Sequence, residues 1–147
     1  MVFAGCSKDD AGSGISGGTP YSGELLGTWE IVYSGDWSEK WTLYSDGSFS
    51  IYYSDDEEWE QDLGLFYVSN NILAITFMKW KDADGAFDYK EEEGDYYTEY
   101  YYVVDVTSEY IEMESFGGND GTVDWGYAED NLEENGTIYS GRKYYKK

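Results

Sequence analysis

Short runs of aromatic and β-branched residues alternate with turn residues from residue 26 to the C-terminus, and this rhythm constrains the fold more than any other feature. Such runs suit the half-buried face of a β-sheet, and the turn residues end each strand after a few positions. No stretch has the apolar periodicity of the long helices that parallel strands need as crossovers. The sequence therefore predicts eight consecutive antiparallel strands, at 29–33, 40–44, 48–53, 63–68, 72–77, 96–106, 109–115 and 137–146.

Three turn signals join neighbouring strands into hairpins. Asp46-Gly47 is typical of a two-residue turn, and further turns are expected at 69–71 and 107–108. Eight strands in such a meander can close into an up-and-down barrel, which leaves no exposed sheet edge. We therefore predict an all-β protein with an eight-stranded antiparallel barrel, and a β-sandwich is the alternative.

Two segments do not fit this pattern. Residues 79–95 and 116–136 are long and rich in acidic residues or Gly, and structureless loops of this length are uncommon in compact domains. The first is expected to extend its flanking hairpin, and 128–135 within the second predict a short helix ended by the Gly that follows. Acidic residues alternate over 82–88, but Phe87 stands at the sixth position, where an EF-hand calcium loop needs Gly. No calcium site is expected there.

The charge balance and the missing residue types exclude several functions. The chain has 31 acidic and 9 basic residues, and the resulting net charge of −22 repels nucleic-acid phosphates and anionic lipid head groups. It has no His, the commonest general base and metal ligand, and its single Cys can form neither an intramolecular disulfide nor a Cys-rich zinc site. Among so many acids, paired carboxylates occur by chance and indicate nothing. We therefore expect no enzyme activity, no metal, no cofactor and no nucleic-acid partner.

The N-terminal residues resemble the export and attachment signals of bacterial lipoproteins. Residues 2–5 (Val-Phe-Ala-Gly) directly precede Cys6, as in a lipobox, where signal peptidase cuts before a Cys that then receives acyl chains. Residues 7–10 (Ser-Lys-Asp-Asp) resemble the Lys and acids that Bacteroidetes-type lipoproteins carry when they are exported to the cell surface. Residues 11–23 are small, polar and rich in Gly, which is typical of a flexible tether. An incidental free Cys is the alternative.

This resemblance implies three parts: the end of a signal peptide at 1–5, a lipidated Cys6 with its tether at 6–23, and a barrel domain at 24–147. It also implies attachment through Cys6 to the outer membrane, at the cell surface or on the periplasmic face. No apolar run approaches the roughly twenty residues that a membrane-spanning helix needs. We expect the anchored domain to be a monomer.

A second resemblance begins at the first predicted strand. Gly27-Thr28-Trp29 resembles the G-x-W signature of lipocalins and fatty-acid-binding proteins, and the hairpin order over 24–115 is similar to that of lipocalin-like domains in Bacteroidetes-type lipoproteins. In lipocalins, the Trp of this signature packs at the closed barrel end beneath an Arg. Arg142 is the only Arg of this chain and lies in the last predicted strand. The resemblance therefore implies that Trp29 and Arg142 stack, with an energy of about 1 kcal/mol. An ordinary surface charge on Arg142 is the alternative.

The same resemblance implies that a small hydrophobic or amphipathic molecule binds inside the barrel and undergoes no chemistry. Strand alternation places six apolar residues on faces that can point inward. They are Trp41, Phe49, Ile51, Ile75, Phe77 and Met113. The same side chains could equally fill the barrel as a solid core, because small barrels are often packed throughout.

Two further functions stay open at this point. Aromatic residues beside acids in the predicted loops indicate a glycan- or protein-binding surface module; they are Trp37, Trp59, Trp80 and Trp125. A structural surface protein with a solid barrel is the third reading. A cavity lined by the inward faces would favour the ligand carrier, and an exposed row of loop aromatics would favour the surface module.

Overall fold

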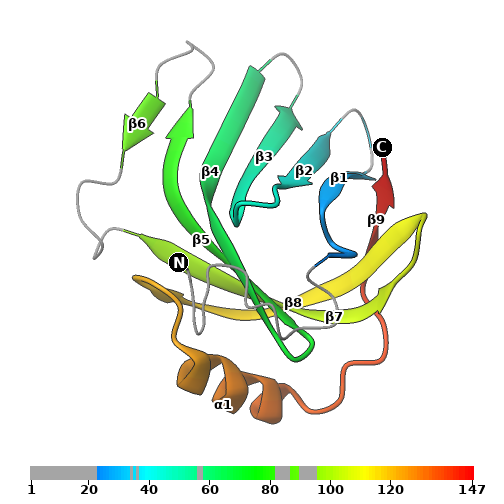
Figure 1. The fold of residues 1–147 in the computed structure, drawn as a ribbon, viewed down its shortest axis with the longest axis vertical. Coiled ribbons are helices and arrows are strands. Elements are labelled where there is room, and N and C mark those ends of the chain that lie inside the picture. Colours follow the sequence, from blue (N-terminus) through cyan, green and yellow to red (C-terminus); the bar gives the residue numbers. More distant parts are fainter. Residues whose placement is uncertain (1–22, 34, 36, 56–57, 82–86, 90–95) are drawn as a thin grey trace.

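The computed structural model describes residues 23–147 apart from 34, 36, 56–57, 82–86 and 90–95. Most of the regular structure in this part of the chain is β-strand (Figure 1). Within these residues, no helix has the length and apolar character needed to cross a membrane. In chain order the elements are β1 (Gly27–Val32), β2 (Ser38–Leu43), β3 (Ser48–Asp55), β4 (Glu58–Ser69), β5 (Ile72–Lys81), β6 (Phe87–Tyr89), β7 (Tyr97–Val106), β8 (Tyr110–Asp120), α1 (Trp125–Asn135) and β9 (Arg142–Lys146).

Eight of the strands form one closed barrel in which every neighbouring pair is antiparallel. The hydrogen-bonded order is β4-β3-β2-β1-β9-β8-β7-β5, and β4 also pairs with β5, which closes the ring. The short β6 pairs with the end of β5 outside this ring. The predicted eight-stranded antiparallel up-and-down barrel is therefore confirmed, and the sandwich alternative is wrong.

The hairpin between β2 and β3 shows how a turn sequence sets strand register. The backbone amide of Tyr44 donates to the carbonyl of Ser48 at 2.9 Å, and the amide of Gly47 donates to the carbonyl of Tyr44 at 3.0 Å. Gly47 has φ +91°, a conformation that favours Gly because it has no Cβ. The loop thus spans three residues, 45–47, as in a turn that ends with a left-handed residue. The turn lies where Asp46-Gly47 predicts it, but the two-residue form is wrong.

The first of the two irregular segments does extend its flanking hairpin. β5 continues to Lys81, and the returning β6 pairs with its last residues, with Lys79 opposite Tyr89. Residues 82–86 and 90–95, which include most of the acidic stretch considered for calcium, lie outside the described residues.

The second irregular segment contains the helix α1, which lies on the outside of the barrel below β7 and β8 in Figure 1. Asp124 caps its start by accepting a hydrogen bond from the amide of Tyr127 at 3.0 Å, and Gly136 ends it with φ +74°. The helix predicted at 128–135 is confirmed and begins three residues earlier. The buried residues between helix and barrel are Ile72, Ala74, Tyr100, Phe116 and Ala128.

The inside of the barrel differs between its two ends. At one end, where β1, β3, β5 and β8 begin, the inward side chains are apolar and almost fully buried, and we call this the packed end. At the other end, where the same strands finish, Tyr and Glu side chains surround a cavity, and we call this the pocket end. The packed end consists of Leu25, Trp29, Leu43, Phe49, Phe66, Val68, Leu73, Val103 and Ile111, each at most 2 % exposed.

Candidate functional site

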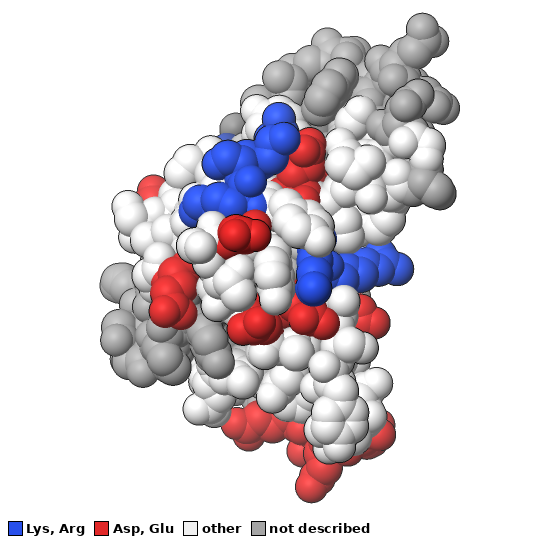
Figure 2. All heavy atoms as spheres, turned by 90° about the vertical axis from the view of Figure 1, so that its right-hand side faces the viewer, with Lys and Arg blue, Asp and Glu red and all other residues white. Residues whose placement is uncertain are grey.

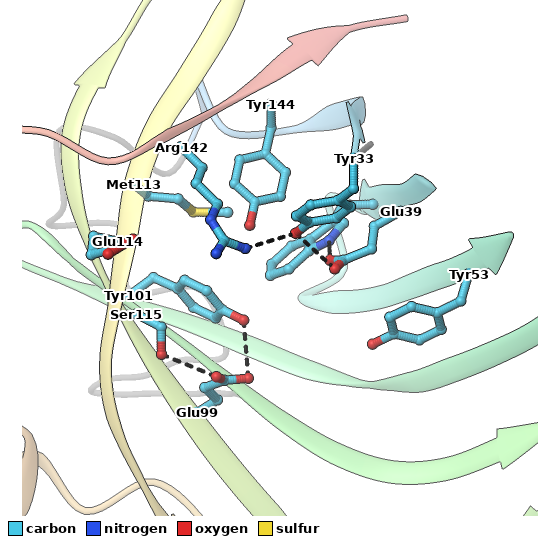
Figure 3. A pocket seen from close by; sticks show the side chains of 11 residues that line it. Tyr33, Glu39, Tyr53, Glu99, Tyr101, Met113, Glu114, Ser115, Arg142 and Tyr144 are labelled. Carbon is cyan, nitrogen blue, oxygen red and sulfur yellow. Dashed lines mark hydrogen bonds between the residues drawn. The ribbon is translucent and has the colours of Figure 1, made fainter. Parts of the chain in front are cut away.

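A pocket of about 330 Å³ lies inside the barrel at the pocket end (Figure 3). Its walls come from the end of β1, the start of β2, the end of β3, the start of β7, the middle of β8 and the start of β9. Because six of the eight barrel strands contribute, the barrel itself holds the lining side chains in place. The lining residues are Tyr33, Glu39, Trp41, Tyr53, Glu99, Tyr101, Met113, Glu114, Ser115, Arg142 and Tyr144.

Aromatic rings form the inner wall of this pocket. The Trp41 ring meets Tyr101 edge-on at 5.2 Å between centroids, and it meets Tyr144 at 5.3 Å. Edge-to-face pairs at such distances are favourable beyond the area that they bury. At the rim, Tyr33 and Trp37 lie with their ring centroids 3.9 Å apart. A molecule in the pocket would therefore contact mostly ring faces and edges on its inner side.

Two carboxylates line the pocket from different strands, and each is held by two neutral donors. Glu39 on β2 accepts hydrogen bonds from the Tyr33 hydroxyl at 2.9 Å and from the Trp41 indole N–H at 2.8 Å. Glu99 on β7 accepts from the Tyr101 hydroxyl at 3.0 Å and from the Ser115 hydroxyl at 3.0 Å. These hydrogen bonds fix the orientation of both carboxylates without cancelling their charge.

Arg142 is the one basic residue that lines the pocket, and it contacts a Tyr. Its guanidinium lies 5.3 Å from the centroid of the Tyr33 ring and donates to the Tyr33 hydroxyl at 3.3 Å. That hydrogen bond raises the pKa of Arg142 further above its usual range. The ion pair of Lys147 with Glu30 lies outside the pocket. Within the described chain, therefore, no basic side chain pairs with Glu39 or Glu99.

The pocket keeps its Tyr hydroxyls protonated. The pKa values of Tyr53, Tyr101 and Tyr144 are raised, mainly because burial disfavours the charged phenolate. At Tyr53 the carboxylate of Asp62 adds most to the rise after burial. The carboxylate of Glu39 adds to the rise at all three, and that of Glu99 adds to it at Tyr53 and Tyr101. The hydroxyls are therefore neutral donors and acceptors at physiological pH, in a region of negative potential.

The six residues predicted to contact a ligand all belong to the inner core of the barrel, but the structure divides them between two places. Trp41 and Met113 line the pocket. Phe49, Ile51 and Ile75 are at most 1 % exposed and fill the interior as core. Phe77 lines a neighbouring depression of about 260 Å³ together with Tyr53, Asp62, Trp80 and Tyr97.

The expected contact between Trp29 and Arg142 is wrong, because the two residues lie at opposite ends of the barrel. Trp29 is buried at the packed end, where its indole donates to the Leu25 carbonyl at 2.8 Å. The cation over its ring is Lys146, whose Nζ lies 4.4 Å from the ring centroid and donates to the Leu26 carbonyl at 2.9 Å. Gly27, the first residue of the signature, has φ +124° and lies directly against the Lys146 side chain. The signature is thus structural, with Lys in the expected place of Arg.

The loop tryptophans lie in different surroundings. Trp37 stacks on Tyr33 at the rim of the pocket, and Trp80 lines the depression beside Phe77. Trp125 belongs to α1 and packs near Tyr100 outside the barrel, with the ring centroids 6.4 Å apart. The side chain of Trp59 and the lipobox-like Cys6 lie outside the described residues.

Sequence reasoning missed the polar lining of the pocket, although strand alternation contains the signal for it. Glu39 has the same parity as Trp41, Tyr53 the same parity as Ile51, and Glu99 the same parity as Tyr101, so each points to the same face. The prediction includes only the apolar members of these faces, because inward positions of a barrel are usually apolar. Among the described residues, no group of three or more His, Cys, Asp or Glu side chains is placed to hold a metal ion.

Comparisons of this chain with protein-family models, with curated proteins and with solved structures found no match. Function must then be argued from the chemistry of the pocket, because one barrel architecture serves many unrelated functions. The pocket offers aromatic walls, neutral hydroxyls and two fixed carboxylates, which is a set of groups suited to binding.

Proposed function

We propose that this protein binds one small amphipathic organic molecule in the pocket and does not convert it. The observation that supports this most directly is the cavity of about 330 Å³ with an aromatic inner wall and a polar rim. Ligand sites in proteins are typically concave spaces of about 300–1,000 Å³ that combine ring surfaces with a few fixed polar groups. The cavity is at the lower end of this range, so it suits a single small molecule.

The division of the barrel supports an amphipathic ligand over a purely hydrophobic one. A hydrophobic ligand would lie deepest in the barrel, but the packed end is already filled by side chains such as Phe66 and Leu73, which are 0 % exposed. The available space is bordered by Glu39, Glu99 and several Tyr hydroxyls. Burying an entirely apolar molecule against these groups would remove water from them and return no hydrogen bond.

The state of the polar groups supports binding over catalysis. Both pocket carboxylates are engaged by neutral hydroxyl or indole donors, so they are held in fixed positions as acceptors. The chain has no His to move protons near neutral pH. A fixed set of acceptors and ring faces is what a carrier or receptor needs for orientation and specificity.

The N-terminal sequence supports a location for this binding activity. The lipobox-like stretch before Cys6 and the Gly-rich tether that follows suit a barrel held at the outer membrane by a lipid, at the cell surface or on its periplasmic face. We therefore propose a lipid-anchored binding protein with a lipocalin-like barrel that acts as a monomer.

Native mass spectrometry of the full 147-residue chain, purified gently from a bacterial host, tests the proposed function. The expected result is an added non-covalent mass of a few hundred daltons that is lost on denaturation. Ser115→Trp places an indole in the pocket and should abolish the added mass. Ser108→Trp is the matched control, because Ser108 is exposed in the turn between β7 and β8 at the packed end.

A screen of small molecules covers the case in which the host lacks the ligand. The indole N–H of Trp41 donates to Glu39 inside the pocket, so its NMR signal reports occupancy. The proposal predicts that some amphipathic compounds shift this signal in the wild type and in Ser108→Trp, and that none binds the Ser115→Trp variant. It fails if no compound moves the Trp41 signal, or if the bound mass persists in Ser115→Trp. Glycan-array binding that Ser115→Trp leaves intact would favour the surface-module reading.

A further inference from the structure

We infer that the ligand of this pocket carries a positive charge, as an ammonium or amidinium group attached to an apolar or aromatic body. The inference rests on the proposed function and specifies its ligand class. The juxtaposition behind it is that of Glu39 and Glu99, which face one small cavity from β2 and β7 between aromatic rings (Figure 3).

The two pocket carboxylates carry more negative charge than the lining compensates. Every hydrogen bond that the described residues make to Glu39 and Glu99 comes from a neutral hydroxyl or indole group. A neutral ligand that closed the pocket would strip water from two negative charges, which is costly. Arg142, the one cation of the lining, is connected to Glu39 only through the Tyr33 hydroxyl, so the two carboxylates outnumber it and neither is paired with it directly. An ammonium group supplies the missing charge and donates hydrogen bonds that are about twice as strong as neutral ones.

The pocket also has unused hydrogen-bonding capacity. A carboxylate oxygen can accept more than one hydrogen bond, and each oxygen of Glu39 and Glu99 accepts one from the described residues. The hydroxyl of Tyr144, a residue only 4 % exposed, also points into the pocket, where the described residues offer it only the Tyr33 hydroxyl. Most of the unused hydrogen-bonding positions are acceptors, so they favour a ligand that is rich in hydrogen-bond donors.

The aromatic wall suits a cation as well. The rings of Trp41 and Tyr101 lie between the two carboxylates, and ring faces attract cations by their quadrupole. The protein already uses this interaction elsewhere, with Lys146 over Trp29 and with Lys143 4.6 Å from the Tyr110 centroid.

The charge distribution of the whole molecule would draw a cation to this site. The net charge is −22, and four of the nine basic residues lie within the last six positions of the chain, at 142, 143, 146 and 147. Figure 2 shows Lys and Arg side chains gathered on the face that the C-terminal strand helps to form. Of the four C-terminal basic residues, only Arg142 lines the pocket. A negative cleft with apolar walls raises the local concentration of cations and speeds their association.

An anionic ligand fits the same pocket poorly. It would have to approach Glu39, Glu99 and Glu114, which line the cavity, and only Arg142 lines it with the opposite charge. Arg142 is exposed at the rim and is already tied to Tyr33. The raised pKa values of Tyr53 and Tyr101, to which both pocket carboxylates contribute, report the same negative potential inside.

A series of three probes of nearly equal shape tests the charge. The full chain is titrated with 2-phenylethylammonium, 2-phenylethanol and 3-phenylpropionate, and dissociation constants are measured by calorimetry and by the Trp41 indole NMR signal. The expected affinity for the ammonium probe is at least about tenfold higher than for the alcohol, since hydrogen bonds from a charged donor are about twice as strong as neutral ones. The carboxylate probe should bind most weakly.

Charge-neutral variants assign the effect to the pocket. Glu99→Gln and Glu39→Gln should each weaken the ammonium probe at least about fivefold and change the alcohol less than about twofold. Glu109→Gln is the matched control, because it removes one charge from an exposed turn at the packed end and should leave all three affinities within about twofold. Unfolding temperatures verify that each variant is folded, and the wild-type series decides the question even if one variant is not.

The outcomes separate this inference from the proposed function. Equal or tighter binding of the alcohol overturns the positive charge and leaves the binding function standing. Preference for the carboxylate probe overturns it in favour of anion recognition by Arg142. If none of the three probes binds, the inference is overturned, whereas the proposed function is decided separately by the bound mass and by the screen.

Discussion

The packed end and the pocket end of this barrel are built by the same strands, yet they differ in almost every chemical respect. On β7 the inward residues run from Val103 through Tyr101 to Glu99, and on β2 they run from Leu43 through Trp41 to Glu39. Each strand thus changes from aliphatic to aromatic to charged over about five residues. One strand can therefore serve the core at one end and the site at the other, without any insertion or extra domain.

The difference has an energetic consequence. Burial of apolar side chains such as Leu73 and Ile111 stabilises the packed end by about 1.5–3 kcal/mol for each residue. At the pocket end, the buried Tyr and half-buried Glu groups contribute little net stability, because their hydrogen bonds mainly replace those to water. The packed end should therefore determine the free energy of unfolding, and the pocket end should determine its dependence on pH and on ligand.

The largest effect that would test this comparison is alkaline unfolding driven by the pocket end. Tyr53, Tyr101 and Tyr144 have raised pKa values in the folded protein, whereas an unfolded Tyr titrates near pH 10. Above about pH 10 the unfolded chain binds fewer protons than the folded one, so stability is complete below that pH and falls as pH rises. Three such groups should cost about 4 kcal/mol for each pH unit. Urea denaturation at pH 8, 10 and 11 measures the loss.

A pair of variants assigns the alkaline effect to the pocket. Tyr144→Phe removes one of the three pocket hydroxyls with the most strongly raised pKa values and should reduce the slope of stability against pH. Tyr139→Phe is the matched control, because Tyr139 is 83 % exposed and lies outside the barrel core. A slope that changes equally in both variants would show that the pocket is not the source of the pH dependence.

The next largest effect belongs to the packed end. Phe49→Ala should lower the free energy of unfolding by about 3–5 kcal/mol, because Phe49 is 1 % exposed and its loss leaves a cavity that cannot collapse. Phe77 makes an edge-on contact with Phe49 at 5.5 Å but lies partly exposed at the pocket end. Phe77→Ala should cost about half as much, since water can enter the space. Urea denaturation compares the two, and equal losses would contradict the division into two ends.

A glycine within β4, at a position where this strand pairs with β5, is the subject of the third prediction. Strand register shifts at Leu63/Gly64, and a Cβ at Gly64 would lie 1.8 Å from the Thr76 carbonyl oxygen and 2.9 Å from the Phe49 ring. Gly64→Ala should therefore destabilise the barrel by about 1–3 kcal/mol through overpacking. Gly117 also lies in a strand, but a Cβ there meets its nearest atoms at 3.6 Å, so Gly117→Ala should change stability by less than about 1 kcal/mol. Thermal and urea denaturation of the two variants test this difference.

Much of the barrel could be predicted because the sequence repeats the same local signals. Aromatic and β-branched runs alternate with turn residues, and the faces of 48–53 and 72–77 that were expected to point inward do so. The helix end at Gly136 was predictable for the same reason, since the chain there takes a positive φ, which favours Gly because it has no Cβ. These features depend on neighbours in sequence.

The pocket and the Trp29 contact could not be predicted in the same way, because they depend on distant residues. Which of Arg142 and Lys146 covers Trp29 depends on the register of β9 against β1, where Lys146 pairs with Trp29. Arg142 and Lys146 are four residues apart on β9, and this separation is enough to place them at opposite ends of the barrel. Similarly, Glu39 and Glu99 are 60 residues apart in sequence, and only ring closure brings them to one cavity.

The two cations of β9 provide the smallest and most discriminating test of the comparison. Lys146→Met keeps the apolar stem but removes the charge over Trp29 and the hydrogen bond to Leu26, so it should cost about 1 kcal/mol of stability and leave binding unchanged. Arg142→Met should change stability by less than about 0.5 kcal/mol, because the side chain is exposed. It should tighten 2-phenylethylammonium binding about two- to threefold, because the substitution removes a positive charge at the rim of the pocket that repels the ammonium group.

Urea denaturation measures the change in stability of each variant, and calorimetry measures the change in its affinity for 2-phenylethylammonium. If Arg142→Met destabilised the protein more than Lys146→Met, the cation at the pocket end would have a structural role and the division between the ends would fail. If Lys146→Met weakened the probe, the packed end would contribute to binding. Since the two residues lie on one strand of five residues, the contrast depends only on which end of the barrel each side chain serves.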